Sequence, residues 1–306
     1  MTTIASPRKR RFKHDDIVFP IVNTFLLVLL MIITLYPVIN TVALSFNDGT
    51  DALKGGITVW PRVFSTKSYE SILSDKAVYQ AAWISASKTV IITILNLFWT
   101  GMLAYSLTRK EYVLRKFMTT LMVLTMYFNA GLIPNYLLIT KTLHLAKSYW
   151  VYIIPTMFSA FNMIVMRTYI AGLPDALVES ARIDGAGDIR IYWQIIFPLC
   201  TPVLATVALF VAVGSWNSWF DTHLYCASKA DLHTMQYLLK LKLASTAQAS
   251  ANSARATADA MKSATQTTPV TIRCAITVVS TVPILVVYPF LQKYFVTGMV
   301  LGSVKE

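Results

Sequence analysis

The chain has 306 residues, of which 55% are hydrophobic and only 14% are charged, whereas an ordinary soluble domain carries about 25% charged residues. This composition excludes a soluble globular protein, because too few polar residues remain to cover a water-facing surface, and it favours a single membrane-embedded unit. The formal net charge of +12 suits a membrane surface better than a nucleic acid, because the sequence has no basic stripe with interleaved aromatic residues.

A basic segment comes directly before the first apolar run. Its basic residues are Arg8, Lys9, Arg10, Arg11 and Lys13. Lys and Arg beside a membrane span are typical of the cytoplasmic side, so we predict that residues 1–16 form a cytoplasmic tail. The apolar run that follows is far longer than the roughly 7 to 15 apolar residues of a secretory signal, and we therefore expect a retained helix.

Six windows of the chain contain no Asp, Glu, Lys or Arg and are long enough to span a bilayer, which takes about 20 residues. They are residues 17–47, 89–108, 117–140, 148–166, 191–220 and 274–292. The sequence therefore predicts an all-α membrane protein with six transmembrane helices within residues 17–298, followed by a cytoplasmic tail at 299–306. Six spans place both termini on one side, and the denser Lys and Arg of the segments on that side predict that both termini are cytoplasmic.

Two connections on the opposite side differ in composition. Residues 47–76 contain several glycines, Pro61 and balanced charge, which predicts a loop or a short helix on the outer face. The external loop predicted at 221–268 ends in a stretch, 243–268, that is mostly Ala, Ser and Thr. This stretch cannot form a core, so we expect either a weak helix or a flexible arm there.

The groups that the chain lacks narrow its function. None of the six windows holds a carboxylate, which a proton- or sodium-coupled transporter usually needs inside the membrane. Lys88 and Arg273 stand at the outer ends of spans two and six, where we expect their long side chains to reach the interface. The sequence has no phosphate-binding G-x-x-x-x-G-K-[ST] stretch, and its 4 His and 3 Cys residues lack the spacing of a metal site, disulfide or catalytic dyad. A pore without its own energy source indicates a subunit of a larger assembly.

A short helix is predicted between spans four and five. Pro174 suits the first position of a helix and Gly185 suits the residue that ends one. Leu177 and Ala181 share a face, and Ser180 and Ala181 keep one side narrow enough to fit a groove. A helix of about ten residues is not stable alone in water, so it needs a partner surface. An amphipathic helix lying on the membrane, with a hydrated glutamate, is the alternative that the residues alone leave open.

The same stretch carries a longer pattern. Glu179, Ser180 and Ala181 are followed at fixed distances by Gly185, Ile195, Phe197 and Pro198. This spacing resembles the E-A-A-x3-G-x9-I-x-L-P sequence in the cytoplasmic loop of ABC importer permeases. The differences are a serine in place of the first alanine and a phenylalanine in place of leucine, and both are conservative in size or character.

Three further runs narrow the resemblance. They are YFNAGLIPNYLL at 127–138, WNSWFDTHLY at 216–225 and VYPFLQKYFVTG at 287–298. These runs are similar to those of the second, maltose-type permease of carbohydrate importers, in the branch that serves oligosaccharides and polysaccharide fragments. The resemblance covers nearly the whole chain beyond the basic tail.

The resemblance implies partners and a location. They are a second permease that forms a heterodimer with this chain, two ATPase subunits and an external sugar-binding protein, all at the bacterial cytoplasmic membrane. ATP and Mg²⁺ would be bound by the ATPase, so no cofactor, metal or catalytic residue is expected on this chain. The residues implied to couple it to the ATPase lie in the loop 173–198 and are Glu179, Ser180, Ala181, Asp184, Gly185, Ile195 and Pro198.

Sugar pathways commonly combine aromatic faces with amides, because rings bury area at little entropic cost and amides bind hydroxyl groups. The candidates here are Asn129 in span three and Trp216, Asn217, Trp219 and Phe220 at the end of span five. Basic groups predicted on the outer side, which would attract carboxylates, are Lys88, Lys229, Lys240, Lys242 and Arg273. The branch that the chain resembles handles large saccharide fragments, often from acidic polymers such as pectin or alginate. Together with these basic groups, the resemblance favours an acidic oligosaccharide over a neutral one. The alternative to transport is a membrane scaffold or assembly protein that docks an ATPase without forming the pathway.

Overall fold

The computed structural model describes residues 14–253 and 267–303, which are predominantly helical and contain no strand. Most of the predicted amino-terminal tail lies outside the described residues, as do parts of the predicted external loop and of the carboxyl-terminal tail. The prediction of a helical membrane protein is therefore confirmed for the part of the chain that the structure describes.

The secondary-structure elements of the described residues follow one another with no sheet among them. They are α1 (His14–Ser45), α2 (Gly49–Ala52), α3 (Lys67–Leu73), α4 (Lys76–Thr108), α5 (Arg115–Tyr127), α6 (Leu132–Leu137), the π-helix η1 (Leu138–Thr142), α7 (Trp150–Ile153), the 3₁₀-helix η2 (Ile154–Thr156), α8 (Ala160–Ala171), α9 (Ala176–Ile183), α10 (Asp188–Ile191), the π-helix η3 (Tyr192–Ile196), α11 (Phe197–Leu199), α12 (Thr201–Asn217), α13 (Phe220–Tyr225), the 3₁₀-helix η4 (Ala230–Leu232), α14 (Met235–Ser253) and α15 (Pro269–Ser303).

Three of these helices are long and apolar enough to cross a membrane. The segments that qualify are Val18–Ser45 of α1, the whole of α4, and Pro269–Pro289 of α15. Each overlaps a predicted window, but α4 begins thirteen residues earlier than the window 89–108 predicts. The reason is that Lys88 ends the charge-free window without ending the helix.

The other three predicted windows fall on bent pairs of helices. Arg115–Tyr127 and Leu132–Thr142 meet at 112°, Trp150–Thr156 and Ala160–Ala171 at 47°, and Asp188–Leu199 and Thr201–Asn217 at 80°. If each pair is one span, the count rises to six. Six spans thus remain a prediction that depends on how these bends sit in a membrane.

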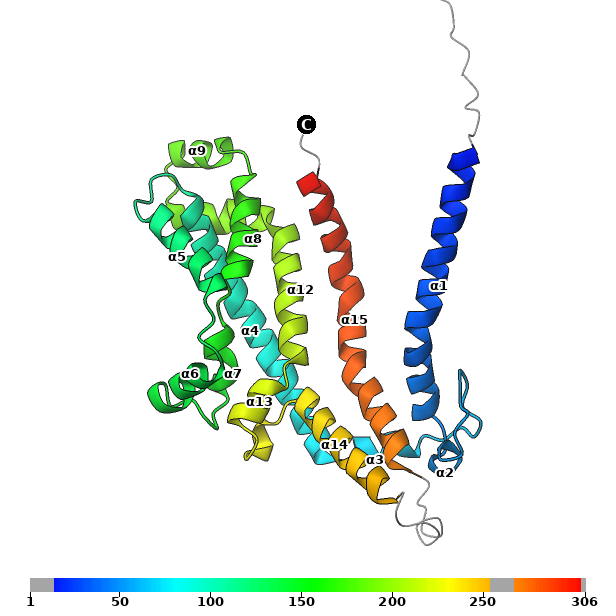
Figure 1. Ribbon diagram of the computed structural model, residues 1–306. Coiled ribbons are helices and arrows are strands. Elements are labelled where there is room, and N and C mark those ends of the chain that lie inside the picture. The colour runs from blue at the N-terminus through cyan, green and yellow to red at the C-terminus, as the bar shows by residue number, and fades with distance from the viewer. Residues whose placement is uncertain (1–13, 254–266, 304–306) are drawn as a thin grey trace, which may run out of the picture. The chain divides into compact units, whose positions relative to one another are not determined.

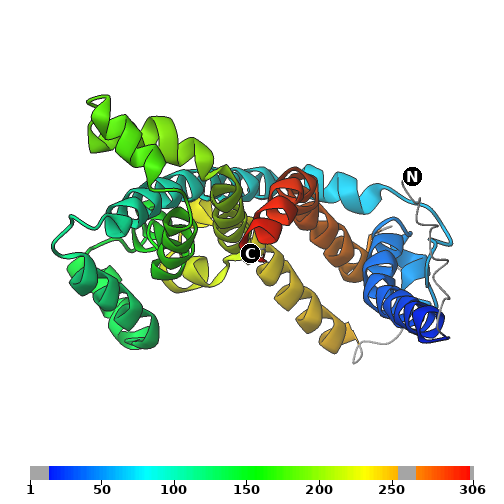
Figure 2. The same cartoon turned by 90° about the horizontal axis from the view of Figure 1, so that it is seen from above.

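The chain divides into two compact units, and the second is built around α4. It comprises Glu70–Arg255 and Val279–Glu306. α4 packs against both α8 and α12, as Figures 1 and 2 show. The core between these helices is apolar, with Leu107, Met163 and Val207 fully buried. Within this unit α9 lies at one end of the three helices, whereas α13 and α14 lie at the opposite end (Figure 1).

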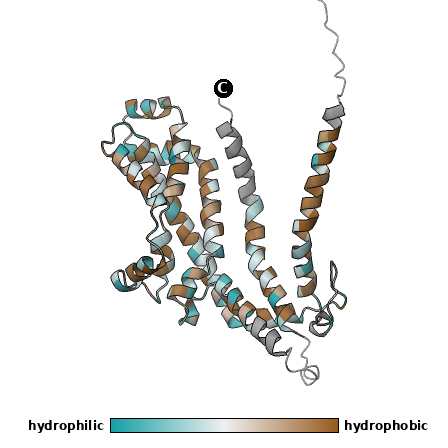
Figure 3. Cartoon of the chain, in the orientation of Figure 1, coloured by the Kyte–Doolittle hydropathy of each residue, from teal (hydrophilic) through white to brown (hydrophobic). Residues whose placement is uncertain are grey.

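The first unit comprises Met1–Tyr69 and Ala256–Val278. α1 is apolar along most of its length (Figure 3), and none of its most apolar window is buried, which suits contact with lipid or another chain. The predicted short helix after it is present as α2 and α3. Asn40 of α1 fixes this loop by donating to the carbonyl oxygens of Ile57 at 2.8 Å and Thr58 at 2.9 Å.

Candidate functional site

α9 is the short helix predicted between spans four and five. It has eight residues, Ala176–Ile183, with Asp175 as the N-cap. Gly185 follows with φ +78°, a left-handed conformation that suits glycine and ends the helix as predicted. The prediction for Pro174 is wrong: the carbonyl of Asp175 accepts the amide hydrogens of the first turn, so the proline lies outside the helix.

The faces of α9 differ from the prediction. Ala181 was expected beside Leu177 on a narrow outward face, but Ala181 is only 7% exposed and Val178 only 4%. Val178 and Ala181 are three positions apart in the sequence, and both pack into the chain's own core with side chains of α4, α8 and α12. The outward surface instead holds Glu179 and Ile183, four apart, and Ile183 is 87% exposed. α9 is therefore anchored on one side and free for a partner on the other.

Ion pairs tie α9 to its neighbours. The guanidinium of Arg182 donates to Glu111 at 2.5 Å and to Asp188 at 3.1 Å. Lys110 pairs with Asp175 at 3.5 Å. The hydrogen bond from Arg182 holds the pKa of Glu111 below its usual range, and the two carboxylates raise the pKa of Arg182. These exposed pairs contribute little to stability, but together they fix the loop before α5 and the start of α10 against α9.

The remaining motif residues lie around this helix. Ser180 and Asp184 are exposed on α9 and at its C-cap. Ile195 is half-buried in the π-helix η3 and packs against the core, while Pro198 is exposed in α11. The 80° bend into α12 falls at Cys200, whose φ of −82° and ψ of 4° leave the helical region. The implied role of Ile195 and Pro198 in setting this angle stays a prediction.

A polar cavity of about 190 Å³ lies among α4, α7, α8, α12 and α13. It is lined by Lys88, Ile92, Asn96, Tyr152, Thr156, Ser159, Asn162, Val211, Gly214, Ser215, Ser218 and Asp221. Hydroxyl, amide, ammonium and carboxylate groups thus share one cavity beside a tyrosine ring. Such a set can bind the hydroxyl groups and the faces of a sugar.

Lys88 does not reach an interface as predicted. Lys88 is 1% exposed and lies inside α4, which begins at Lys76 and continues to Thr108. The ammonium donates to the carbonyl oxygen of Ser218 at 3.3 Å and lies 5.1 Å from the centroid of the Tyr152 ring. The sequence windows could not reveal this, because they were defined to stop at a charge.

Asn96 and Asn162 are two cavity residues that the sequence analysis missed. Asn162 donates to the side-chain oxygen of Asn96 at 3.2 Å, and Asn96 donates to the carbonyl of Thr156 at 3.3 Å. Both asparagines are buried. Both lie within charge-free windows of the sequence, where an amide is costly unless it is partnered, so this signal could have identified the pair.

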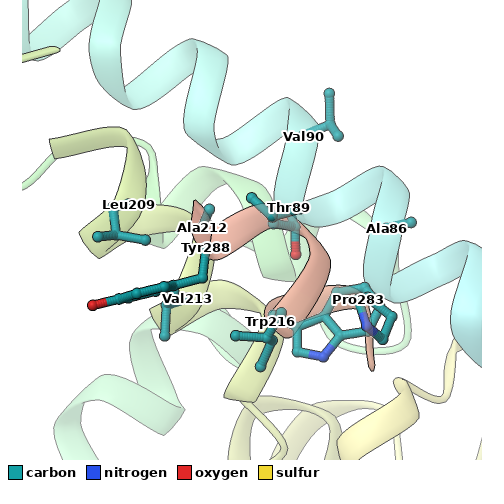
Figure 4. A pocket seen from close by; sticks show the side chains of 11 residues that line it. Ala86, Thr89, Val90, Leu209, Ala212, Val213, Trp216, Pro283 and Tyr288 are labelled. Carbon is teal, nitrogen blue, oxygen red and sulfur yellow. The ribbon is translucent and has the colours of Figure 1, made fainter. Parts of the chain in front are cut away.

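Three of the residues predicted to contact sugar, Asn129, Trp216 and Asn217, do not line the polar cavity. Asn129 lies in the break between α5 and α6, where its side-chain oxygen accepts the amide of Gly131 at 2.9 Å. Trp216 is 9% exposed, donates to the carbonyl of Ser280 at 3.0 Å, and lines an apolar pocket of about 250 Å³ among α4, α12 and α15 (Figure 4). Asn217 accepts from Gln236 at 3.3 Å.

Trp219 and Phe220 lie at the end of the second unit opposite α9. Their rings meet edge to face with centroids 5.5 Å apart. The ammonium of Lys240 lies 3.6 Å from the centroid of the Trp219 ring, a cation–π contact. Lys242 pairs with Asp75 at 3.3 Å in the same region. The predicted residues therefore belong to three separate places and not to one site.

Comparison with known proteins identifies the class. Residues 98–220 match the family described as the binding-protein-dependent transport system inner membrane component, and this region includes α9. The chain is 35% identical over 279 residues to the polygalacturonan/rhamnogalacturonan transport system permease protein YtcP of Bacillus subtilis, covering 91% of this chain and 95% of that protein. It is 28% identical over 286 residues to the arabinooligosaccharides transport system permease protein AraQ of Halalkalibacterium halodurans, covering 89% and 92%.

A solved structure has the same fold. It is a crystal structure of a bacterial ABC transporter involved in the import of the acidic polysaccharide alginate, with a TM-score of 0.82 at 28% identity over 94% of this chain and 100% of that chain. The chain thus belongs to the binding-protein-dependent inner membrane components, as a permease of the carbohydrate ABC importers. Membership in this family confirms the predicted resemblance. It implies that the chain functions together with a second permease, an ATPase and a substrate-binding protein.

Proposed function

We propose that this chain forms part of the pathway of an ATP-driven importer that moves an oligosaccharide or polysaccharide fragment into the cytoplasm. An external binding protein delivers the sugar, and a second permease completes a heterodimer. Two ATPase subunits bind ATP and Mg²⁺ and dock on α9. Both termini of this chain then face the cytoplasm, with α13 and α14 on the outer side of the bacterial cytoplasmic membrane.

The observation that carries this proposal is the anchored but open geometry of α9. Val178 and Ala181 join the helix to the core of α4, α8 and α12. The opposite face offers Glu179 and an 87% exposed Ile183, and Ile189 beyond the helix is 73% exposed. A helix held this way transmits a push from a docked partner to the spans behind it, because packed cores shift as units and resist bending.

The competing function is a scaffold that docks an ATPase and forms no pathway. The buried polar cavity among α4, α8 and α12 favours transport, because polar groups are costly inside a membrane and a scaffold has no use for them. The complete importer, reconstituted in vesicles with its binding protein, should take up labelled oligosaccharide only when ATP and this chain are both present. Uptake that continues without this chain would leave only the scaffold role.

An acidic oligosaccharide is the proposed substrate. Support comes from two relatives: one is a polygalacturonan and rhamnogalacturonan transport permease, and the other belongs to an importer of the acidic polysaccharide alginate. The lysines at the α13 and α14 end, among them Lys229, Lys240 and Lys242, would attract carboxylates there. Uptake of trigalacturonate should exceed uptake of arabinotriose, and the reverse order would exclude the acidic class.

A further inference from the structure

The most unusual group in the second unit is the ammonium of Lys88. It is 1% exposed, yet the side chain reaches the polar cavity of about 190 Å³. In the part of the chain that the structure describes, no Asp or Glu oxygen lies within 4.0 Å of this ammonium. The protein thus keeps a cation within a candidate span without a contact ion pair.

The contacts of Lys88 do not account for its presence as a structural element. An ammonium has three N–H donors, and one of them reaches the Ser218 carbonyl at 3.3 Å while the Tyr152 ring lies 5.1 Å away. A buried charge held so loosely is costly, and a well-packed apolar residue would stabilise the same place better. An ionisable residue within a membrane span is therefore most simply explained by function.

The surroundings of Lys88 are arranged to receive a polar ring. Tyr152 is held in place because its hydroxyl donates to the Leu232 carbonyl at 2.8 Å. Asn96 and Asn162 form a linked amide pair on the neighbouring helices. Asp221 also lines the cavity, and its carboxylate accepts a hydrogen bond from the Ser218 hydroxyl. A cation, an anion, amides and an aromatic face thus converge from α4, α7, α8 and α13.

We infer that Lys88 binds the carboxylate of a uronate residue as an acidic oligosaccharide passes through this cavity. The carboxylate of Asp221 lines the same cavity but makes no contact ion pair with Lys88, so a substrate anion at contact distance would supply that pair. The amides can donate to and accept from the hydroxyl groups of the same sugar ring, and Asp221 can accept from them. The cavity is smaller than the roughly 300 to 1,000 Å³ of drug-sized pockets, which suits one sugar residue at a time. This inference rests on the proposed function of the chain as a sugar pathway.

The test uses the complete reconstituted importer with trigalacturonate and arabinotriose as substrates. Lys88→Gln should lower trigalacturonate uptake at least about tenfold, because one partner of a buried charge pair is lost. ATP hydrolysis stimulated by the loaded binding protein should change less than twofold, since the coupling surface at α9 is untouched. Lys88→Arg keeps the charge and should retain most uptake, and Lys141→Gln, which removes an exposed lysine outside the cavity, should match the wild type.

Each remaining result has a defined meaning. Wild-type uptake of trigalacturonate by Lys88→Gln would overturn the assignment. Equal loss of assembly, ATP hydrolysis and uptake in both Lys88→Gln and Lys88→Arg would also overturn it, because that result would show that Lys88 only packs the core. A wild-type importer that carries arabinotriose but not trigalacturonate would overturn the inference and the acidic substrate class, and it would leave the proposed role in oligosaccharide import intact. A wild-type importer that carries neither sugar would contradict the proposed function itself.

Discussion

At the scale of single residues, Arg182 makes the contacts that hold α9 to the loop before α5. Its hydrogen bond depresses the pKa of Glu111 in the folded protein. A depressed carboxyl pKa contributes stability that is complete above the ordinary pKa and is lost as the pH falls through the lowered value. We therefore expect residues 109–116 to lose protection from amide exchange, corrected for intrinsic rates, as the pH falls below about 4.

The matched variant for this prediction is Arg182→Gln. It removes the hydrogen bond to Glu111 and the one to Asp188 while keeping a polar but uncharged and shorter side chain. The loop should then exchange rapidly at neutral pH and show no further change on acidification. If amide exchange in the loop of the variant still increased by the same amount on acidification, another group would control the loop.

Glu179 is the exposed carboxylate that the motif assigns to the ATPase interface. Glu179→Lys reverses the charge on the outward face of α9 without touching Val178 or Ala181. The chain should still insert and assemble, but uptake should fall at least about tenfold, because charge pairs closed off from water at an interface are costly to lose. Asp231→Lys, an exposed charge reversal at the opposite end of the unit, is the control. Normal uptake by Glu179→Lys would remove its assigned role.

Sequence reasoning at this scale succeeded where a residue type had one meaning. Gly185 ends α9 because few other residues adopt φ +78°. It failed for Ala181 and Lys88, because a small residue can face a partner or its own core, and a lysine can reach water or enter a cavity. Only the packing of α4 against α8 and α12 decides these cases.

At the scale of elements, α4 approaches η3 so closely that one position requires glycine. A Cβ at Gly101 would clash with the hydroxyl of Tyr192 and lie 3.2 Å from the terminal methyl of Met166. Alanine usually stabilises a helix interior relative to glycine, but here overpacking should cost about 1 to 3 kcal/mol. Gly101→Ala should therefore lower the Tm of the purified chain in detergent.

The control for this prediction is a glycine in α12, a helix that also packs against α4. An added Cβ at Gly214 of α12 meets nothing within 4 Å. Gly214→Ala should therefore leave the Tm unchanged or raise it slightly. Equal effects of the two substitutions would show that the contact with Tyr192 does not limit the packing of α4.

The bends between helices are the feature of the elements that the sequence could not predict. A window without charges reports that a segment is apolar but contains no information on its direction. The 112° bend between α5 and α6 follows from Gly131 at φ +86° and the Asn129 side chain bonded to its amide. The 80° bend falls at Cys200, whose φ and ψ leave the helical region, and the contribution of Pro198 to the angle stays a prediction. Such bends depend on the backbone conformation of single residues, so composition identified the segments and not their shape.

For the whole molecule, composition and one motif were enough to predict the class of protein. The charge-free windows indicated helices in a membrane, and the Glu179 to Pro198 spacing indicated the transporter family, which comparison confirmed. The polar cavity could not be predicted from the sequence, because its residues come from six elements, lie up to 133 positions apart and share no spacing. Sites of this kind are created by packing alone.

The orientation of the whole chain in the membrane is the last prediction. α9 and α14 lie at opposite ends of the second unit (Figure 1), so the two ends should label from opposite sides. A cysteine at Ser245 of α14 should react with a membrane-impermeant maleimide in intact cells, and one at Ile189 only after lysis. The native Cys200, Cys226 and Cys274 are all buried, which keeps background labelling low. Labelling of Ile189→Cys in intact cells, with Ser245→Cys protected, would reverse the topology and place α9 away from any cytoplasmic ATPase.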